Sequence, residues 1–576
     1  MRRVPFFKPF SVVADGLIFL FVAAVIYGIT AFAAQWNSSY NPVYDIDLSL
    51  SALPLYALFS SLRGLIAYLV SLAFTLVVGY WAAKSPRAEK VILPLLDVMQ
   101  SIPVLGFLPG LVLGLVAIFP RTNVGLELAS VLMIFSGQVW NMAFAFYSSL
   151  KSVPTDLKEA AAVMKLSSFQ RLELLELPYS AMNLTWNSVM SMAGGWFFLT
   201  VCEAFTLGEQ TYRLPGLGSY MAVAIESGNS RAMVGGVGAM IAVILLFDIL
   251  LWRPALVWAH RFRIEEGDGQ QKQDEPLLAL LIKDSVVARL IKGIYFRPAG
   301  RSRLRKEIRE WRTPALKMID VDRLTEKQRW IMRGVVGVAC AVVVLYGSVR
   351  LVQTLLSVPA ADWLVIVGGT GFTLLRVLTA VAIGTLWATP MGIWIVQNPR
   401  RLRLAQPVVQ LLASFPAPML YPLAISLFLA LRLNFEISSM LLMLLGVQWY
   451  ILFNVIAGAL RIPVELRYGM RLMGSSRRDQ WRYLFLPSVL PSLVTGWVTA
   501  AGGAWNASIV SELIQYKGTT LEAHGLGALI SKAAAHGDFA RLACCLFVMV
   551  VVVVTFNRMV WARVYRMAQT RFRMDL

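Results

Sequence analysis

The chain has 576 residues, of which 57% are hydrophobic and only 15% are charged. This composition excludes an ordinary soluble protein, and the length excludes a single membrane anchor. The formal net charge of +20 would suggest nucleic-acid binding in a soluble protein. Here the Lys and Arg residues gather in a subset of loops, a pattern that reflects membrane topology. We therefore predict an integral membrane protein with no nucleic-acid partner.

Apolar stretches of about 20 residues, the length that crosses a bilayer as a helix, recur along nearly the whole chain. They predict an all-α integral membrane fold of about twelve transmembrane helices. In the first half the stretches lie near residues 12–34, 65–83, 103–119, 126–150, 182–205 and 234–259. In the second half they lie near residues 332–356, 375–396, 407–431, 437–460, 489–514 and 541–561.

A charged, basic segment at residues 261–329 separates the two halves. We expect it to be a cytoplasmic linker between a first repeat, 1–260, and a second, 330–576. Residues 276–296 within it are apolar but contain four charged side chains, which makes a further span unfavourable. We interpret that stretch as a helix on the membrane surface or on a cytoplasmic partner.

The distribution of basic residues predicts the orientation. Arg2, Arg3 and Lys8 precede the first span, whereas the loop from 35 to 62 contains no Lys or Arg. The positive-inside rule then places the N-terminus in the cytoplasm. An even number of spans places the C-terminus, with its basic residues 558–573, on the same side.

The two halves align with a nearly constant offset, so the chain is a parallel duplication. Arg63, Pro94, Pro103 and Pro109 recur 313 positions later as Arg376, Pro407, Pro416 and Pro422. From there the offset is 309, and it relates Trp140, Pro154, Pro178, Gly194, Trp196, Glu203, Gly216 and Gly218 to Trp449, Pro463, Pro487, Gly503, Trp505, Glu512, Gly525 and Gly527. Corresponding loops of the two repeats should therefore face the same compartment.

The longest inside loop of the first half, residues 154–178, reads PTDLKEAAAVMKLSSFQRLELLELP. It resembles the EAA loop of ABC importer permeases. Glu159, Ala160, Ala161, Leu177 and Pro178 match that pattern. The pattern also has a glycine at the turn. Its place is taken here by a basic residue, Lys165.

The second half has the turn glycine that the first half lacks, but it does not have the Glu-Ala-Ala sequence. Gly474, Leu486 and Pro487 fall at the same spacing, while Glu-Ala-Ala is replaced by Tyr468, Gly469 and Met470. In the family this loop forms a two-helix knob that docks on an ATPase. The resemblance thus implies two coupling loops, and the different turn residues predict unequal docking contacts.

Two further segment pairs, AGGWFFLTVCEAF with LPGLGSYM and GGAWNASIVSELI with HGLGALI, resemble the nitrate, sulfonate and bicarbonate branch of these permeases. This resemblance covers nearly the whole chain. It implies two fused repeats of the type I ABC importer permease fold in a bacterial inner membrane, a solute pathway for a small anion-like solute, and a proline-interrupted third span in each repeat.

The expected partners supply what the chain lacks. It has no GxxxxGK[ST] phosphate loop, no metal-ligand spacing and no catalytic constellation. We therefore expect neither enzymatic activity nor a cofactor or metal in this chain. Two ATPase copies would carry ATP and Mg, and a separate extracytoplasmic binding protein would deliver the solute. The sequence does not identify that solute, because selectivity in this class rests largely on the binding protein.

Polar, aromatic and proline residues at membrane depth are the candidates for the translocation pathway. They are Arg63, Arg376, Pro103, Pro416, Gln138, Trp140, Trp449, Glu203, Glu512 and Asn506. The two arginines could attract an anion, bridge to a carboxylate across the two halves or reach the membrane surface. The two glutamates could instead form hydrogen bonds between helices, because a carboxylate in the pathway would repel an anion. The amides and indoles could equally join or pack helices.

Two alternative functions belong to other classes. A twelve-span secondary transporter with a parallel repeat would be driven by an ion gradient, with Glu203 and Glu512 as ion-coupling candidates. A non-transporting membrane scaffold or sensor would use the basic linker as its binding module. The paired EAA-type loops favour the ABC importer over both.

Overall fold

Helices form most of the chain in the computed structural model, which describes residues 26–101, 103–208, 210–262 and 326–571. The chain divides into two compact units. Unit 1 comprises residues 1–27 and 267–358, and unit 2 comprises residues 28–266 and 359–576. The predicted surface helix at 276–296 and most of the first predicted span lie outside the described residues. Residues 26–37 are helical.

The first repeat occupies the N-terminal part of unit 2. Its elements are α2 (Leu53–Phe74), η1 (Thr75–Gly79), α3 (Tyr80–Lys84), α4 (Pro86–Ser101), η2 (Val104–Phe107), α5 (Leu108–Ile118), α6 (Val124–Lys151), α7 (Thr155–Val163), α8 (Ser168–Arg171), η3 (Leu172–Glu176), α9 (Leu177–Cys202), β1 (Ala204–Leu207), β2 (Gln210–Arg213), α10 (Leu217–Glu226), α11 (Ser230–Phe247), η4 (Asp248–Trp252) and α12 (Arg253–His260).

The second repeat follows the same order. Its elements in unit 2 are α17 (Ala360–Val396), α18 (Pro399–Ser414), η6 (Ala417–Leu420), α19 (Tyr421–Ala430), α20 (Phe435–Leu460), α21 (Val464–Leu472), α22 (Arg477–Asp479), η7 (Gln480–Phe485), α23 (Leu486–Ser511), β3 (Leu513–Tyr516), β4 (Thr519–Glu522), α24 (Leu526–Ala535), α25 (Phe539–Phe556), η8 (Asn557–Trp561) and α26 (Ala562–Arg571). α16 (Glu326–Ser357), which contains the predicted span at 332–356, belongs to unit 1.

Within the described residues, seven helices are long and apolar enough to cross a membrane, or eight if a bent pair counts as one span. They correspond to the predicted second, fourth and sixth spans of the first repeat and the second, fourth, fifth and sixth spans of the second repeat. The predicted fifth span of the first repeat is helical as α9, but it is not among the seven. The all-α membrane fold is thus confirmed, whereas the count of twelve spans stays a prediction.

The predicted third span of the second repeat is interrupted at a proline, and that of the first repeat begins at one, after the end of α4. α18 ends at Ser414 and the chain turns by 89° before the next helix. Pro103 and Pro416 are extended at the equivalent breaks, with ψ of 112° and 111°. Proline removes a backbone donor and disfavours a helical residue before it, which accounts for a break at this position in each repeat.

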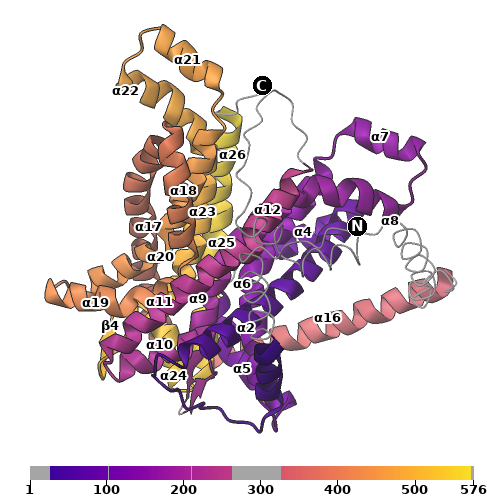
Figure 1. The fold of residues 1–576 in the computed structure, drawn as a ribbon. Coiled ribbons are helices and arrows are strands. Elements are labelled where there is room, and N and C mark those ends of the chain that lie inside the picture. Colours follow the sequence, from indigo (N-terminus) through magenta and orange to yellow (C-terminus); the bar gives the residue numbers. More distant parts are fainter. Residues whose placement is uncertain (1–25, 102, 209, 263–325, 572–576) are drawn as a thin grey trace, which may run out of the picture. The chain divides into compact units, whose positions relative to one another are not determined.

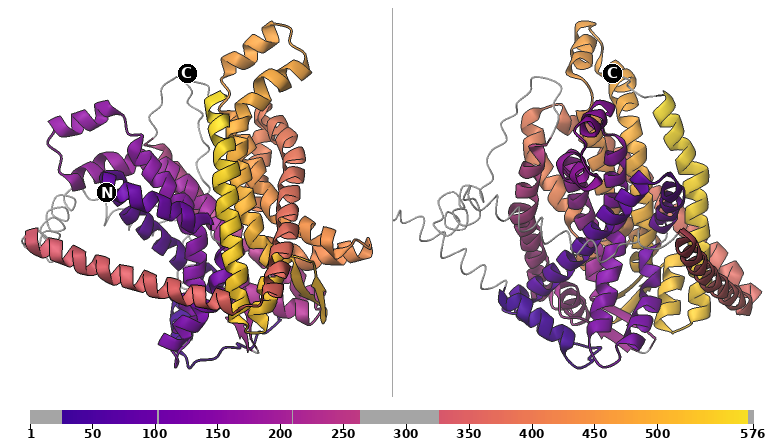
Figure 2. Two further views of the ribbon diagram at one scale, coloured as in Figure 1. Left: turned by 180° about the vertical axis from the view of Figure 1, so that it is seen from behind. Right: turned by 90° about the vertical axis from the view of Figure 1, so that its right-hand side faces the viewer.

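The two ends of unit 2 carry different elements (Figures 1 and 2). The helical hairpins α7–α8 and α21–α22 protrude at the same end, apart from one another. At the other end lie α10, α24 and two antiparallel hairpins, β1–β2 and β3–β4. Their registers are equivalent, with Ala204 opposite Arg213 in one repeat and Leu513 opposite Glu522 in the other. Corresponding loops therefore share an end, as a parallel duplication requires.

Each repeat packs its broken third span against the fifth span of the other. α9 contacts α18 and η6, while α23 contacts η2. A second contact joins the strand-bearing ends, where the Gly208 N–H donates to the Ala534 carbonyl at 2.9 Å. Aromatic rings of Trp186 and Phe453 also meet across the repeats at 5.7 Å. The helices that line the seam between repeats thus come from both halves of one chain.

Candidate functional site

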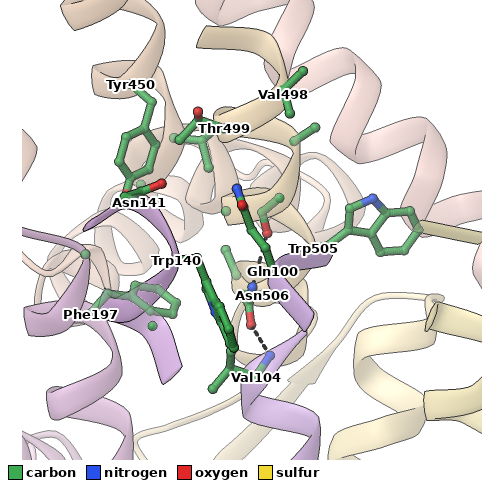
Figure 3. A pocket seen from close by; sticks show the side chains of 18 of the residues that line it. Gln100, Val104, Trp140, Asn141, Phe197, Tyr450, Val498, Thr499, Trp505 and Asn506 are labelled. Carbon is green, nitrogen blue, oxygen red and sulfur yellow. Dashed lines mark hydrogen bonds between the residues drawn. The ribbon is translucent and has the colours of Figure 1, made fainter. Parts of the chain in front are cut away.

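A cavity of about 170 Å³ lies in this seam, between α6 and α9 of the first repeat and α20 and α23 of the second (Figure 3). Its polar lining consists of Gln100, Ser136, Trp140, Asn141, Ser191, Tyr450, Thr499, Trp505, Asn506, Asn557 and Trp561. Among the described lining residues there is no Lys, Arg, His, Asp or Glu. A neutral, polar and aromatic cavity at the interface of two repeats is a typical place for a transported solute.

Asn506 links the two repeats at the edge of this cavity. Its side-chain oxygen accepts a hydrogen bond from the Val104 N–H at 2.9 Å (Figure 3). Val104 follows the helix break at Pro103, so its N–H has no partner within a regular helix. The repeat-related residue of Asn506 is Phe197, which cannot accept such a bond. The first repeat therefore provides no equivalent side-chain acceptor for the broken third span of the second repeat.

Of the other predicted pathway residues, Trp140 lines the cavity, whereas Trp449 and Gln138 are not among its lining residues. The Trp140 indole N–H is buried and has no hydrogen-bond partner among the described residues. Trp449 packs edge-to-face on Trp387, with ring centroids 5.9 Å apart. The Gln138 amide nitrogen lies 3.4 Å from the Met192 sulfur. Trp140 thus offers an unused donor beside the cavity.

Arg63 lies in a fully buried cluster of charged groups in the first repeat. It forms two hydrogen bonds of 2.8 Å to the Glu127 carboxylate and an ion pair with Glu203. Glu203 also accepts from the Ser60 hydroxyl at 2.7 Å and from the Gly218 N–H at 2.6 Å. The cluster ties α2, α6 and α9 to the start of α10, so Arg63 bridges to carboxylates within its own repeat and not, as predicted, across the two halves. Its members satisfy one another, as buried charges require.

The second repeat contains the same cluster at the equivalent positions. Arg376 pairs with Glu512 at 2.7 Å and also with Glu436. The Thr373 hydroxyl and the Gly527 N–H both donate to Glu512 at 2.8 Å. Here the cluster is less enclosed.

The second cluster is less enclosed because one of its carboxylates reaches solvent. Glu436 is 34% exposed, and it also pairs with His524, at 2.7 Å. The repeat-related residue of His524 is Pro215.

The clusters also explain two of the recurring glycines. A Cβ on Gly216 would lie 2.3 Å from the Glu203 carboxyl carbon, and one on Gly525 would lie 2.4 Å from that of Glu512. Only glycine lets the backbone approach so closely. Glu127 and Glu436, the remaining carboxylates, are not sequence-predicted site residues. The offset of 309 relates them as well, and a search for recurring acidic residues would have found them.

The predicted coupling loops form two equivalent helical hairpins. Lys165 and Gly474 occupy the same turn position, with left-handed φ values of 49° and 65°. In the first hairpin the Leu166 N–H donates to Ala161 at 3.1 Å and the Lys165 N–H to Ala162 at 2.9 Å. This is the Schellman pattern that ends a helix at a left-handed residue. Lys165 therefore adopts the left-handed backbone conformation that glycine favours at this position.

The turns of both hairpins expose large apolar side chains. Val163 and Met164 are 83% and 71% exposed, and their repeat counterparts Leu472 and Met473 are 88% and 83% exposed. Glu159, Ala160 and Tyr468 are also exposed, Gly469 and Met470 are partly buried, and Ala161 is buried. A pair of exposed apolar residues at the same place in both repeats indicates a surface that contacts another protein.

Comparison with known families decides what the duplication represents. The family described as "Binding-protein-dependent transport system inner membrane component" matches twice, at residues 75–252 and 380–572, which together form more than half of the chain. The chain is a member of this family. It is thus a permease component of an ABC importer, built from two fused family units. This permease is a multi-pass inner-membrane transport component and not an enzyme, and the match favours it over a gradient-driven transporter or a scaffold.

The relatives of the permease are named for different substrates. The nitrate import permease protein NrtB of Synechococcus elongatus is 25% identical over 199 residues, 33% of this chain and 68% of the relative. The taurine transport system permease protein TauC of Escherichia coli K12 is 25% identical over 29% of this chain and 56% of its own length. The glycine betaine/proline betaine permease protein ProW of the same strain is 30% identical over 32% and 48%.

A solved structure is also similar to part of the chain. A chain from the inward-facing MetNI methionine ABC transporter, in the CY5 native crystal form, is 20% identical. The similarity covers 37% of the permease and 99% of that chain, with a TM-score of 0.32.

Proposed function

We propose that this permease forms the entire translocation pathway of an ATP-driven importer for a small anion-like solute, which it carries by alternating access. Two copies of an ATPase subunit, each with ATP and Mg, dock on the hairpins α7–α8 and α21–α22. An extracytoplasmic binding protein delivers the solute to the opposite end. Both termini are then cytoplasmic, in agreement with the distribution of Lys and Arg.

The observation that carries the coupling proposal is the repeated hairpin turn. The first helix of each hairpin ends at a left-handed residue, and the turn presents two apolar side chains to solvent. An exposed apolar pair is unfavourable unless a partner covers it. Because both hairpins lie at one end of unit 2, a symmetric pair of ATPase subunits can reach both. Closure of that pair would then pull on both repeats at once.

The solute proposal rests on the seam cavity. Its neutral lining contains amide, hydroxyl and indole donors, including the unpartnered Trp140 N–H, and no carboxylate among the described lining residues. Donors without nearby carboxylates suit an oxyanion. The aromatic groups Trp140, Phe197, Tyr450 and Trp505 favour a second candidate, a quaternary ammonium solute, by cation–π attraction.

Co-purification with the ATPase subunit tests the coupling proposal. Native mass spectrometry of the detergent-solubilised complex should give two ATPase copies per permease chain. Val163→Asp with Met164→Asp should leave one copy, and adding Leu472→Asp and Met473→Asp should leave none. Lys517→Asp, in the β3–β4 turn at the opposite end, is the control and should retain both. Two copies on the fourfold variant would overturn the docking assignment.

Uptake by proteoliposomes containing the complete importer tests the solute class. Nitrate, taurine and glycine betaine should be offered with ATP inside and binding protein outside. Preference for nitrate, with at least a tenfold loss in Trp140→Phe, would support the anion. Preference for glycine betaine, retained in Trp140→Phe because the ring remains, would support the ammonium alternative.

A further inference from the structure

A second cavity, of about 1030 Å³, lies in the second repeat beside the α21–α22 hairpin. It is bounded by the end of α17, the start of α18 and the residues that run from α21 to η7. Three arginines line it, and none of the other described lining residues is acidic. They are Arg401, Arg467 and Arg477. This arrangement concentrates positive charge around a space large enough for a small ligand.

Each arginine is positioned differently. The Arg401 guanidinium lies 4.2 Å from the centroid of the Trp394 ring. Arg467 donates to the carbonyls of Ala459 at 2.8 Å and Ile462 at 3.1 Å. Arg477 is exposed at the start of α22.

The cavity leaves two of these charges without an acidic partner. No described carboxylate forms an ion pair with Arg401 or Arg477. The carboxylate of Asp479, two residues from Arg477, instead accepts from the Ser476 hydroxyl at 2.6 Å as part of a helix cap. Two guanidinium groups therefore remain available to an anion.

The equivalent place in the first repeat has different charges. There Lys84 and Glu176 form an ion pair, whereas their counterparts in the second repeat are Gln397 and Phe485. The counterparts of Arg401 and Arg477 are the uncharged Ala88 and Ser168. The second repeat has thus lost an internal pair and gained two cations, so an anion from outside the chain would meet net positive charge there.

We propose that this cavity binds the phosphate group of an anionic phospholipid, held by Arg401 and Arg477. The planar guanidinium offers two parallel donors to phosphate oxygens, which suits this group better than a point charge does. The large apolar side chains Met391 and Trp394 at its rim are 43% and 50% exposed, so an acyl chain can lie beside them.

The choice of a lipid over a soluble anion follows from location. α17 is one of the helices able to cross the membrane, and the cavity lies at its last turns. Anionic lipids are concentrated in the cytoplasmic leaflet, where aromatic and basic residues commonly anchor a membrane protein. The cytoplasmic placement rests on the proposed orientation. The binding of a phosphate group does not rest on that orientation.

Isothermal titration of the purified full chain, without any ATPase, tests the proposal. The probes are dihexanoyl phosphatidylglycerol, dihexanoyl phosphatidylcholine and inorganic phosphate. The test variant combines Arg401→Gln and Arg477→Gln. The control combines Arg403→Gln and Arg478→Gln, which removes the same charge from exposed positions on the same two helices. Gel filtration checks that both variants keep the native elution volume.

We expect saturable binding of phosphatidylglycerol and none of phosphatidylcholine, with a Kd at least tenfold weaker in the test variant and unchanged in the control. Phosphate that binds as tightly and competes would keep the anion site but overturn the lipid as its source. Equal binding of both lipids, no binding by the wild-type chain, or the same loss in both variants would overturn the site. A loss of ATPase docking would not affect this result, so the two proposals can fail separately.

Discussion

At the scale of single residues, the buried clusters around Arg63 and Arg376 are the most constrained part of the permease. Each arginine forms ion pairs with two carboxylates, and each cluster joins helices that are distant in sequence. Removing one partner of a buried pair leaves an uncompensated charge, which costs more than the pair itself contributes. Their structural role is evident from these contacts, while a role in the solute pathway remains a prediction.

Arg63→Ala should therefore lower the free energy of unfolding by about 3–5 kcal/mol, because Glu127 and Glu203 stay buried without a cation. Arg376→Ala should lower it less, since Glu436 reaches solvent and keeps His524 as a neighbour. Chemical unfolding of the purified chain in mixed micelles measures both. An equal loss for the two variants would contradict the difference in enclosure, and the exposed Arg403→Ala is the control.

The turn residue of the first coupling hairpin is a second local prediction. A non-glycine residue in the left-handed region is unfavourable by about 1 kcal/mol. Lys165→Gly should remove this strain and slow amide hydrogen exchange in residues 155–171, whereas Gly474→Lys should introduce it and speed exchange in residues 464–480. Opposite signs for the two substitutions are the expected signature. Equal signs would mean that side-chain contacts, not backbone conformation, control the turns.

At the scale of elements, the broken third span depends on an acceptor supplied by the other repeat. Asn506→Leu, of similar size, should leave the Val104 N–H buried without its bond and lower the free energy of unfolding by about 1–3 kcal/mol. Thr499→Val is the matched control, because it lines the same cavity without contacting that break. Stability equal to the control would show that another group satisfies this N–H.

The sequence predicted these elements unevenly. The long uninterrupted spans and both hairpins follow from hydropathy and from the EAA-type pattern, and both prolines mark the breaks correctly. The sequence could not show that Trp140 lines the cavity whereas Trp449 does not, because their packing depends on neighbours such as Trp387 from another helix. Arg63 and Glu203 were noticed singly, but their pairing needs the three-dimensional approach of α2 and α9.

At the scale of the whole molecule, the contacts between repeats predict that the linker peptide bond is dispensable for assembly. The seam includes α9 against α18, α23 against η2 and the Gly208 to Ala534 hydrogen bond. A chain cut within residues 263–325, with a tag on one half only, should yield both halves in equal amounts after affinity purification. Recovery of the tagged half alone would show that covalent linkage holds the repeats together.

The single bond between Asn506 and Val104 has a consequence for recognition. A pore made from two identical subunits must present the same groups to both sides of a bound molecule, since every substitution appears twice. Here an amide stands on one side and the phenyl ring of Phe197 on the other. Because the two repeats are fused in one chain, the residues on the two sides of the cavity can diverge independently. The cavity can therefore distinguish the polar end of a solute from its apolar end, which a symmetric channel cannot do.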